Sequence, residues 1–163
     1  MIYYDLEQKK PVEKGKFSED EEGYSIITEG VFYCFGNSKI TARDHSIVTA
    51  YDNSLITAKD NSWIIACDNS KVWANDTSKV EARGNSIIIA KGNSKVWAND
   101  KSKITANGDS KVWAHGKSEV DSYGNSKVEA YDKSKVWAFE NSWVEAKDNS
   151  KLKDLRTRPQ TRH

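Results

Sequence analysis

Serine and histidine are the residues of this 163-residue chain whose types could support catalysis. Serine stands at every eighth position from Ser38 to Ser150, fifteen times without interruption. A nucleophilic serine needs a base held beside it, whereas fifteen equivalent serines at one spacing are typical of a structural role. The histidines, His45, His115 and His163, have no Cys, His or carboxylate at metal-ligand spacing. We therefore expect no enzyme, no metal site and no cofactor.

Aspartates near the ends of the eight-residue units are a second group of candidate ligands. Calcium-binding nonapeptide repeats follow the pattern GGxGxDxUx, whereas Asp52 and Asp60 in this chain directly precede Asn-Ser. Ice binding needs one regular array of outward threonines, but Thr41, Thr49 and Thr57 fall in successive octads and therefore on different sides of a coil. Neither calcium nor ice is an expected ligand.

The octads themselves predict the fold. Each places Ser, Val or Ile, and Ala at positions i, i+2 and i+4, as in Ser94, Val96 and Ala98. This period of two is the signature of a β-strand with one buried face. Between the strands stand pairs such as Asp52-Asn53, which tolerate the left-handed backbone of a sharp corner. The chain is therefore expected to be all-β, a parallel β-helix (β-solenoid) whose coils stack about 4.8 Å apart.

Two coil sizes are compatible with this repeat. With three octads per coil, the middle outward positions sort by type, and one column would contain Thr41, Ile65, Ile89, Trp113 and Trp137. With two octads per coil, Trp, Thr, Glu and Ile mix in both columns. Fifteen octads also make five whole triangular coils. We therefore predict a triangular solenoid of about five coils with about 24 residues each, and the alternative is a flattened two-sheet roll with about 16 residues per coil.

The repeat divides the chain into three parts. Residues 1–35 lie outside the repeat and include an acidic run, and we interpret them as an N-terminal cap over the open end of the solenoid. Residues 36–154 are the octapeptide-repeat solenoid, which ends where Asp154 takes an inward position. Residues 155–163 are a basic C-terminal tail.

Charge and hydropathy restrict the partners. The formal net charge is +1, which argues against nucleic acid as the main partner. No apolar run approaches the length of a membrane span, and the start, MIYYDLEQKK, lacks the apolar core of a signal peptide. We expect a cytoplasmic protein with no membrane partner, and a phage particle is the alternative location.

The tryptophans point to a binding surface. All six occupy outward positions of the octads, and an exposed aromatic surface of this density is typical of an interaction site. Lysines at the first outward position are interleaved with them, a combination that could stack on bases or sugars and neutralise phosphates. The candidate interface residues on one side of the triangular coil are Trp63, Ile65, Ile87, Ile89, Trp113, Trp137 and Phe139, and the candidate binding residues outside it are Trp73 and Trp97.

The units DNSKVWAN, GNSKVEAY and DNSWVEAK follow a D/G-N-S-x-V-x-A-x consensus. They resemble the octapeptide-repeat proteins of gut bacteria and their phages, and the resemblance covers about three quarters of the chain. It implies a β-solenoid architecture. It implies no activity, because the family is uncharacterised.

Together these features predict a non-enzymatic β-solenoid that acts as a scaffold or binding protein. We expect it to form a homodimer through the Trp/Ile face, because two such stripes facing each other across a two-fold axis would both be buried. One alternative is a carbohydrate- or polymer-binding module that uses the Trp/Lys surface, for example as part of a phage particle that binds a polysaccharide. Another alternative is an inhibitor whose partner is a host protein.

Overall fold

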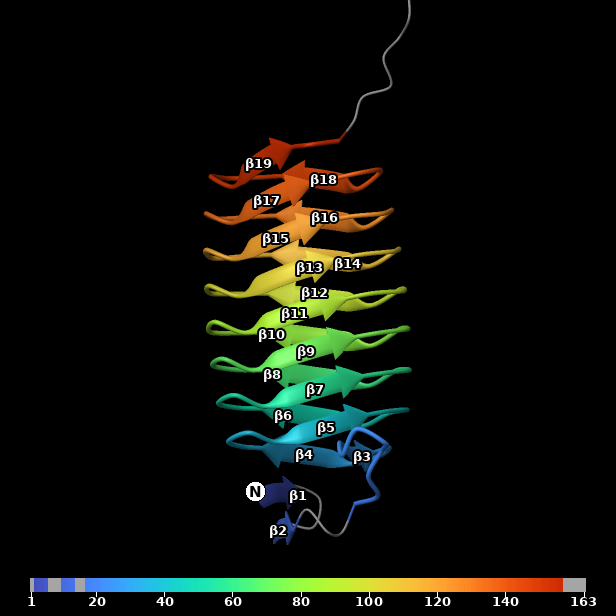
Figure 1. Cartoon of the computed structure of the whole chain (residues 1–163). Helices are drawn as coiled ribbons and strands as arrows, with labels where there is room; N and C mark the ends of the chain where they lie inside the picture. Colours follow the sequence, from blue (N-terminus) through green and yellow to red (C-terminus); the bar gives the residue numbers. More distant parts are fainter. Residues whose placement is uncertain (1, 6–9, 14–16, 157–163) are drawn as a thin grey trace, which may run out of the picture.

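The chain forms two parallel sheets that face each other, and from residue 25 onward it passes from one sheet to the other after every strand (Figure 1). This computed structural model describes residues 2–5, 10–13 and 17–156. The strands of sheet A in the described residues are β1 (Ile2–Asp5), β2 (Lys10–Glu13), β4 (Val31–Cys34), β6 (Ile47–Ala50), β8 (Trp63–Ala66), β10 (Lys79–Ala82), β12 (Lys95–Ala98), β14 (Lys111–Ala114), β16 (Lys127–Ala130) and β18 (Trp143–Ala146). Those of sheet B are β3 (Ser25–Ile27), β5 (Lys39–Ala42), β7 (Leu55–Ala58), β9 (Lys71–Ala74), β11 (Ile87–Ala90), β13 (Lys103–Ala106), β15 (Glu119–Ser122), β17 (Lys135–Ala138) and β19 (Lys151–Asp154). These segments include no helix, and so none that is long and apolar enough to cross a membrane.

Alternate residues of the repeat strands point into the space between the two sheets. In β12, Val96 and Ala98 are buried while Lys95 and Trp97 are partly exposed. The Val and Ile side chains at the middle inward position are at most 2% exposed along the stack from β5 to β17, and the repeat serines are buried there as well. The parallel β-solenoid is therefore confirmed, and so is the burial of Ser, Val or Ile, and Ala from β5 to β17. In the last two strands the prediction does not hold, because Ala146 and Leu152 are exposed where no further coil covers them.

The coil contains about 16 residues and there are about eight coils, so the predicted triangular coil of three octads is wrong. Val80 lies between Ile64 and Val96 as its direct partners on the neighbouring strands of sheet A. Val72, which the triangular coil would have stacked on Val96, lies beside Ile88 in sheet B. The flattened two-sheet alternative is the one that the chain adopts.

The corners explain why two octads close a coil. The N–H of Ser46 donates to the carbonyl of Arg43 at 3.1 Å across a four-residue turn, and Asp44 in that turn has a φ of 52°. A positive φ at a central position of a four-residue turn allows the chain to reverse direction sharply, and Asp tolerates this conformation better than most residues. A three-sided coil would need corners that bend the chain far less. Every octad has the same inward residues, so the inward pattern alone could not distinguish two sides from three.

Corner carboxylates also connect successive coils. Oδ2 of Asp52 accepts a hydrogen bond from the backbone N–H of Gly36 at 2.8 Å, in the corner two octads earlier. Asp132 accepts one from Gly116 at 2.9 Å in the same way. These bonds satisfy backbone donors that the turns leave unpaired, which gives the corner aspartates a structural role.

The two ends of the solenoid differ from its middle. At the N-terminal end, β1 runs antiparallel to β4, and the ring of Phe17 packs edge-to-face on that of Phe32 with centroids 5.4 Å apart. At the other end, Arg156 donates through Nε to the Asp154 carboxylate at 2.7 Å and through a terminal nitrogen to the Ser142 carbonyl at 3.0 Å. The guanidinium therefore ties the end of β19 to the start of β18 and balances the charge of Asp154.

We expect cysteines placed two octads apart to lie side by side and cysteines placed three octads apart to lie on opposite faces. Lys111→Cys with Lys127→Cys should react rapidly with a short bis-maleimide cross-linker, because β14 and β16 pair in register about 4.8 Å apart. Lys111→Cys with Lys135→Cys should not, because Lys135 belongs to sheet B. Mass spectrometry of peptides, in a background where the free Cys67 is replaced by serine, identifies the linked pair. Cross-linking of the second pair and not the first would contradict the two-octad coil.

Candidate ligand-binding face

The outer face of sheet A carries four lysines in one column. Lys79, Lys95, Lys111 and Lys127 occupy the first outward position of successive strands and are direct neighbours in register. We call these four residues the lysine column. Trp63 and Trp143 occupy the same position on the strands that flank it, and these two indoles are 43% and 48% exposed. The column thus has an exposed aromatic side chain beyond each end.

A pair of stacked tryptophans lies beside the lysine column. Trp97 and Trp113 occupy the next outward position of β12 and β14, with ring centroids 5.2 Å apart and ring planes 12° from parallel. A hollow of about 580 Å³ lies next to the pair, and Trp63 and Lys79 contribute to its lining. The residues that complete the lining are Glu81, Lys95, Asn99 and His115.

The carboxylates of this face are engaged by cations outside the lysine column. Glu81 pairs with Arg83 at 2.7 Å, and Glu129 and Glu145 pair with Lys147 at 3.3 and 3.4 Å. Among the described residues, none of the four lysines of the column forms an ion pair. The middle of the face therefore carries uncompensated positive charge next to aromatic rings.

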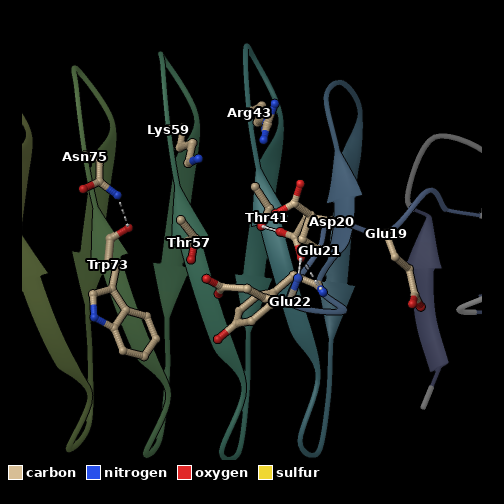
Figure 2. Close-up of a pocket in the computed structure, with 11 residues that line it drawn as sticks. Glu19, Asp20, Glu21, Glu22, Thr41, Arg43, Thr57, Lys59, Trp73 and Asn75 are labelled. Carbon is tan, nitrogen blue, oxygen red and sulfur yellow. Dashed lines mark hydrogen bonds between the residues drawn. The ribbon is translucent and has the colours of Figure 1, made fainter.

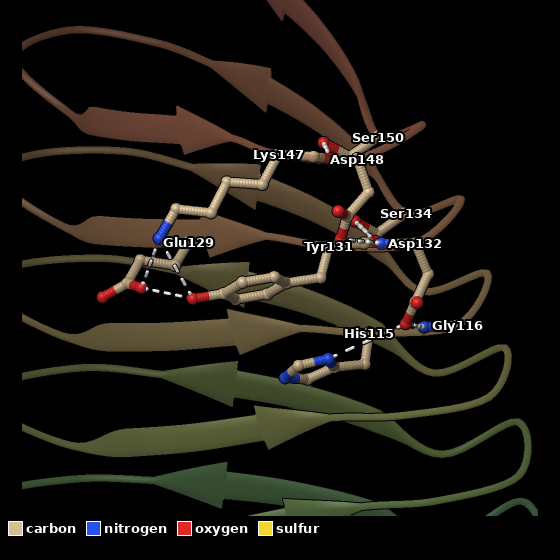
Figure 3. A network of polar contacts seen from close by, with 9 residues as sticks. All are labelled: His115, Gly116, Glu129, Tyr131, Asp132, Ser134, Lys147, Asp148 and Ser150. Atoms are coloured by element: carbon tan, nitrogen blue, oxygen red, sulfur yellow. Dashed lines mark hydrogen bonds and ion pairs between the residues drawn. The ribbon is translucent and has the colours of Figure 1, made fainter.

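A polar network borders this face near the corner of β16 (Figure 3). The hydroxyl of Tyr131 donates to Glu129 at 2.6 Å, and Nζ of Lys147 donates to Glu129 at 3.3 Å and to the Tyr131 oxygen at 3.2 Å. His115 stacks on the Tyr131 ring with centroids 4.7 Å apart, and its Nδ1 lies 3.7 Å from a carboxylate oxygen of Asp132. These contacts fix the side chains at the border of the hollow.

The same contacts shift two pKa values. The hydrogen bond from Tyr131 lowers the pKa of Glu129 most, and contacts with Lys147 lower it further. The contacts of Lys147 with Tyr131, Glu129 and Glu145 raise the pKa of the Lys147 ammonium. Both shifts favour the charged forms, so Glu129 and Lys147 remain an ion pair and neither is suited to exchange a proton near neutral pH.

A second groove, of about 660 Å³, lies between residues 19–24 and the outer face of sheet B (Figure 2). Oγ1 of Thr41 donates to Asp20 at 2.6 Å and is the main cause of the lowered pKa of that carboxyl group. Arg43 and Lys59 face the acidic residues across the groove, and Trp73 forms its far end. The lining has four carboxylates and only two cationic side chains, so the groove carries net negative charge and does not favour an anionic ligand.

A third hollow, of about 510 Å³, lies farther along sheet B. It contains Asp121, whose pKa is raised first by burial and then by the charge of Glu119. Trp137, Phe139 and Ile87 contribute apolar walls. The raised pKa reflects a carboxylate without a cationic partner strong enough to offset its burial.

The structure divides the candidate residues between the two sheets. Those on sheet A are Trp63, Ile65, Trp97 and Trp113, and those on the sheet B side are Trp73, Ile87, Ile89, Trp137 and Phe139. The prediction of a single Trp/Ile face depended on the three-octad coil. It is wrong, because these residues lie on two opposite faces. All nine side chains are partly or fully exposed, as predicted. Whether they form an interface stays a prediction.

Sequence reasoning missed the network around Tyr131. Its members share one signal, which is their spacing: His115, Tyr131 and Lys147 stand two octads apart at the last outward position of their octads. That spacing becomes informative only when the coil length is known.

No family model matches the chain, and no match to a curated protein or to a solved structure was found. The resemblance to octapeptide-repeat proteins therefore stays a prediction. Function has to be argued from the residues of the chain itself.

We expect Tyr131→Phe to raise the pKa of Glu129, because it removes the hydroxyl that lowers this pKa most while keeping the ring that stacks on His115. A carboxyl group with a lowered folded pKa stabilises the protein above its unfolded pKa, and that stabilisation is lost as the pH falls through the folded pKa. In the parent this loss lies below the ordinary value of 4.5, and in the variant it should move upward. NMR titration of the Glu129 carboxyl carbon measures the shift. An unchanged titration would show that the hydroxyl is not its cause.

Proposed function

We propose that this protein is a non-enzymatic β-solenoid scaffold that binds an extended carbohydrate-type polymer along the outer face of sheet A. The observation that carries the proposal is the hollow bordered by Trp63 and the stacked pair Trp97 and Trp113. Aromatic rings with polar groups at their margins bind ligands that have both apolar faces and hydroxyl groups, because the ring covers the apolar face and the margin satisfies the hydroxyls. Sugars have this combination.

The regular coil spacing supports a polymeric ligand. Each coil repeats the outward positions about 4.8 Å farther along the axis, so a chain lying along the axis meets a lysine in four successive coils. Asn99 and His115 place polar groups on the side of the tryptophan stack opposite the lysines. The strands hold these positions rigidly, which reduces the entropy lost on binding.

The inner residues support a binding role over catalysis. The repeat serines are buried in the core from β5 to β17, where no substrate could reach them. In the described residues, no group of three or more His, Cys, Asp or Glu side chains could hold a metal ion. The accessible chemistry is therefore that of aromatic, amide and charged side chains on a flat sheet.

A comparison of two double variants tests this function. Trp97→Thr with Trp113→Thr should weaken polysaccharide binding about tenfold or more, because each lost aromatic contact contributes about 0.5–1.5 kcal/mol beyond its buried area. Threonine occurs naturally at this position in Thr49 and Thr105, so the fold should tolerate it. The matched control is Trp73→Thr with Trp137→Thr on sheet B. Binding is measured on a glycan array and then by isothermal titration. Equal losses in both variants would contradict a site on sheet A.

Self-association is the second candidate function, and the apolar part of sheet B favours it. Ile87 is 40% exposed, and Ile89 is the direct neighbour of Trp73 across β11 and β9. Two copies facing each other across a two-fold axis would bury these side chains together. This interface leaves the outer face of sheet A free, so the dimer and the polymer-binding site are compatible.

Replacing Ile87 by Lys and Ile89 by Thr should convert a dimer into a folded monomer. The change puts a charge and a hydroxyl into the centre of the proposed contact and leaves the core residue Ile88 in place. The matched control places Lys and Thr at Trp63 and Ile65, the equivalent positions of β8 on sheet A. Multi-angle light scattering gives the mass, with circular dichroism as the check on folding. A parent that is monomeric at high concentration would remove this candidate.

A further inference from the structure

The lysine column is unfavourable in the absence of a ligand. Lys79, Lys95, Lys111 and Lys127 are in register on adjacent strands, so their charged groups start from backbone positions about 4.8 Å apart. Like charges directly opposite each other on neighbouring strands are destabilising. Outward positions on a solenoid tolerate many residue types, as the Thr, Ile, Glu and Trp at the next position show. The run of four lysines therefore carries an energetic cost that a bound anionic ligand would remove.

Sheet B shows how the same position is neutralised within the chain. There Glu119 lies between two lysines, 3.9 Å from Lys103 and 3.1 Å from Lys135. On sheet A, by contrast, Glu81 is held by Arg83 and both Glu129 and Glu145 by Lys147. From β10 to β18 the outward positions of sheet A carry six Lys or Arg side chains and only three carboxylates. From β11 to β19 the outward positions of sheet B carry five lysines and two carboxylates, so the two faces have a similar excess of positive charge. Sheet A differs in that four of its lysines are direct neighbours in register with no carboxylate between them.

We propose that the polymer bound by sheet A is acidic, a polysaccharide whose carboxylates lie along the lysine column while its sugar rings pack on the neighbouring tryptophans. This inference rests on the function proposed above and adds the charge and direction of the ligand. The four lysines span about 14 Å along the solenoid axis, so the chain runs parallel to that axis. Trp63 and Trp143 stand at the two ends of the lysine column, where further sugar rings would pack.

The tryptophan geometry favours sugars over the bases of a nucleic acid strand. Trp97 and Trp113 stack on each other at 5.2 Å, so no base can insert between them. Binding of single strands relies on successive bases stacking on separate aromatic faces. A sugar chain instead needs the outer surfaces of the rings and a row of cations beside them, which is the arrangement present here.

The test compares two variants that lose the same charge. Lys95→Gln with Lys111→Gln removes the middle of the lysine column, and the control Lys71→Gln with Lys151→Gln removes two lysines at the same position of sheet B strands. The probes are polygalacturonate, its fully methyl-esterified neutral form, and poly(U). Isothermal titration at low and high salt gives each affinity, and thermal melting verifies that both variants are folded.

We expect the parent to bind polygalacturonate at least about tenfold more tightly than the neutral ester, with an affinity that falls as salt increases. The sheet A variant should lose about tenfold in affinity for the acid and almost nothing for the ester, whereas the control should match the parent. Equal affinity of the parent for both forms would overturn the acidic ligand and leave the proposed function intact. Tighter binding to poly(U), lost in the sheet A variant, would replace the sugar by nucleic acid. Binding to neither sugar probe would overturn both proposals.

Discussion

The reversal of the chain at each corner is the constraint on which the rest of this structure depends. The backbone hydrogen bond from each repeat serine after Ser38 to the carbonyl three residues before it, such as Ser46 to Arg43, closes a turn in which one residue has a positive φ. Asp or Gly occupies that position in almost every corner, since these residues tolerate it best. Because every corner reverses the chain, strands alternate between two sheets, and residues two octads apart become neighbours.

Because residues two octads apart are neighbours, the inward residues stabilise the fold while the outward residues remain free to vary. The inward column needs the same small and β-branched residues in every coil, since the space between the sheets is uniform and closely packed. The outward columns have no such requirement, so their residues can vary without disturbing the core. Stacked pairs on the outside, such as Tyr123 with Phe139 at 4.5 Å, add contacts between coils. An unfavourable outward column, such as the four lysines of sheet A, can persist because the core and the backbone ladders supply the stability.

The sequence was sufficient to predict the strands, their inward residues and the exposure of the tryptophans, because a period of two reports burial directly. It was not sufficient for the coil length, which depends on backbone angles at corners where Asp, Asn and Gly permit several geometries. Because the coil length was not known, the neighbours of each outward residue in the candidate site could not be predicted either. With three octads per coil, Lys95 would lie beside Glu119 and be neutralised; with two octads it lies between Lys79 and Lys111. Trp63 and Trp97 were identified as candidates from the sequence, but the residues that surround them could not be identified.

Alternation between the sheets also determines which octads supply the residues of each face. Consecutive octads contribute to opposite faces, so the lysine column of sheet A is interleaved along the sequence with Ile87, Lys103 and Glu119 of sheet B. Inserting or deleting one octad would move every later outward side chain to the other face. Inserting or deleting two octads would only lengthen or shorten both faces by one coil. A set of side chains that shares one face therefore stays together only when octads are gained or lost in pairs. The lysine column occupies alternate octads from Lys79 to Lys127 without a break. Its period is therefore the 16-residue coil, and it cannot be seen by comparing one octad with the next.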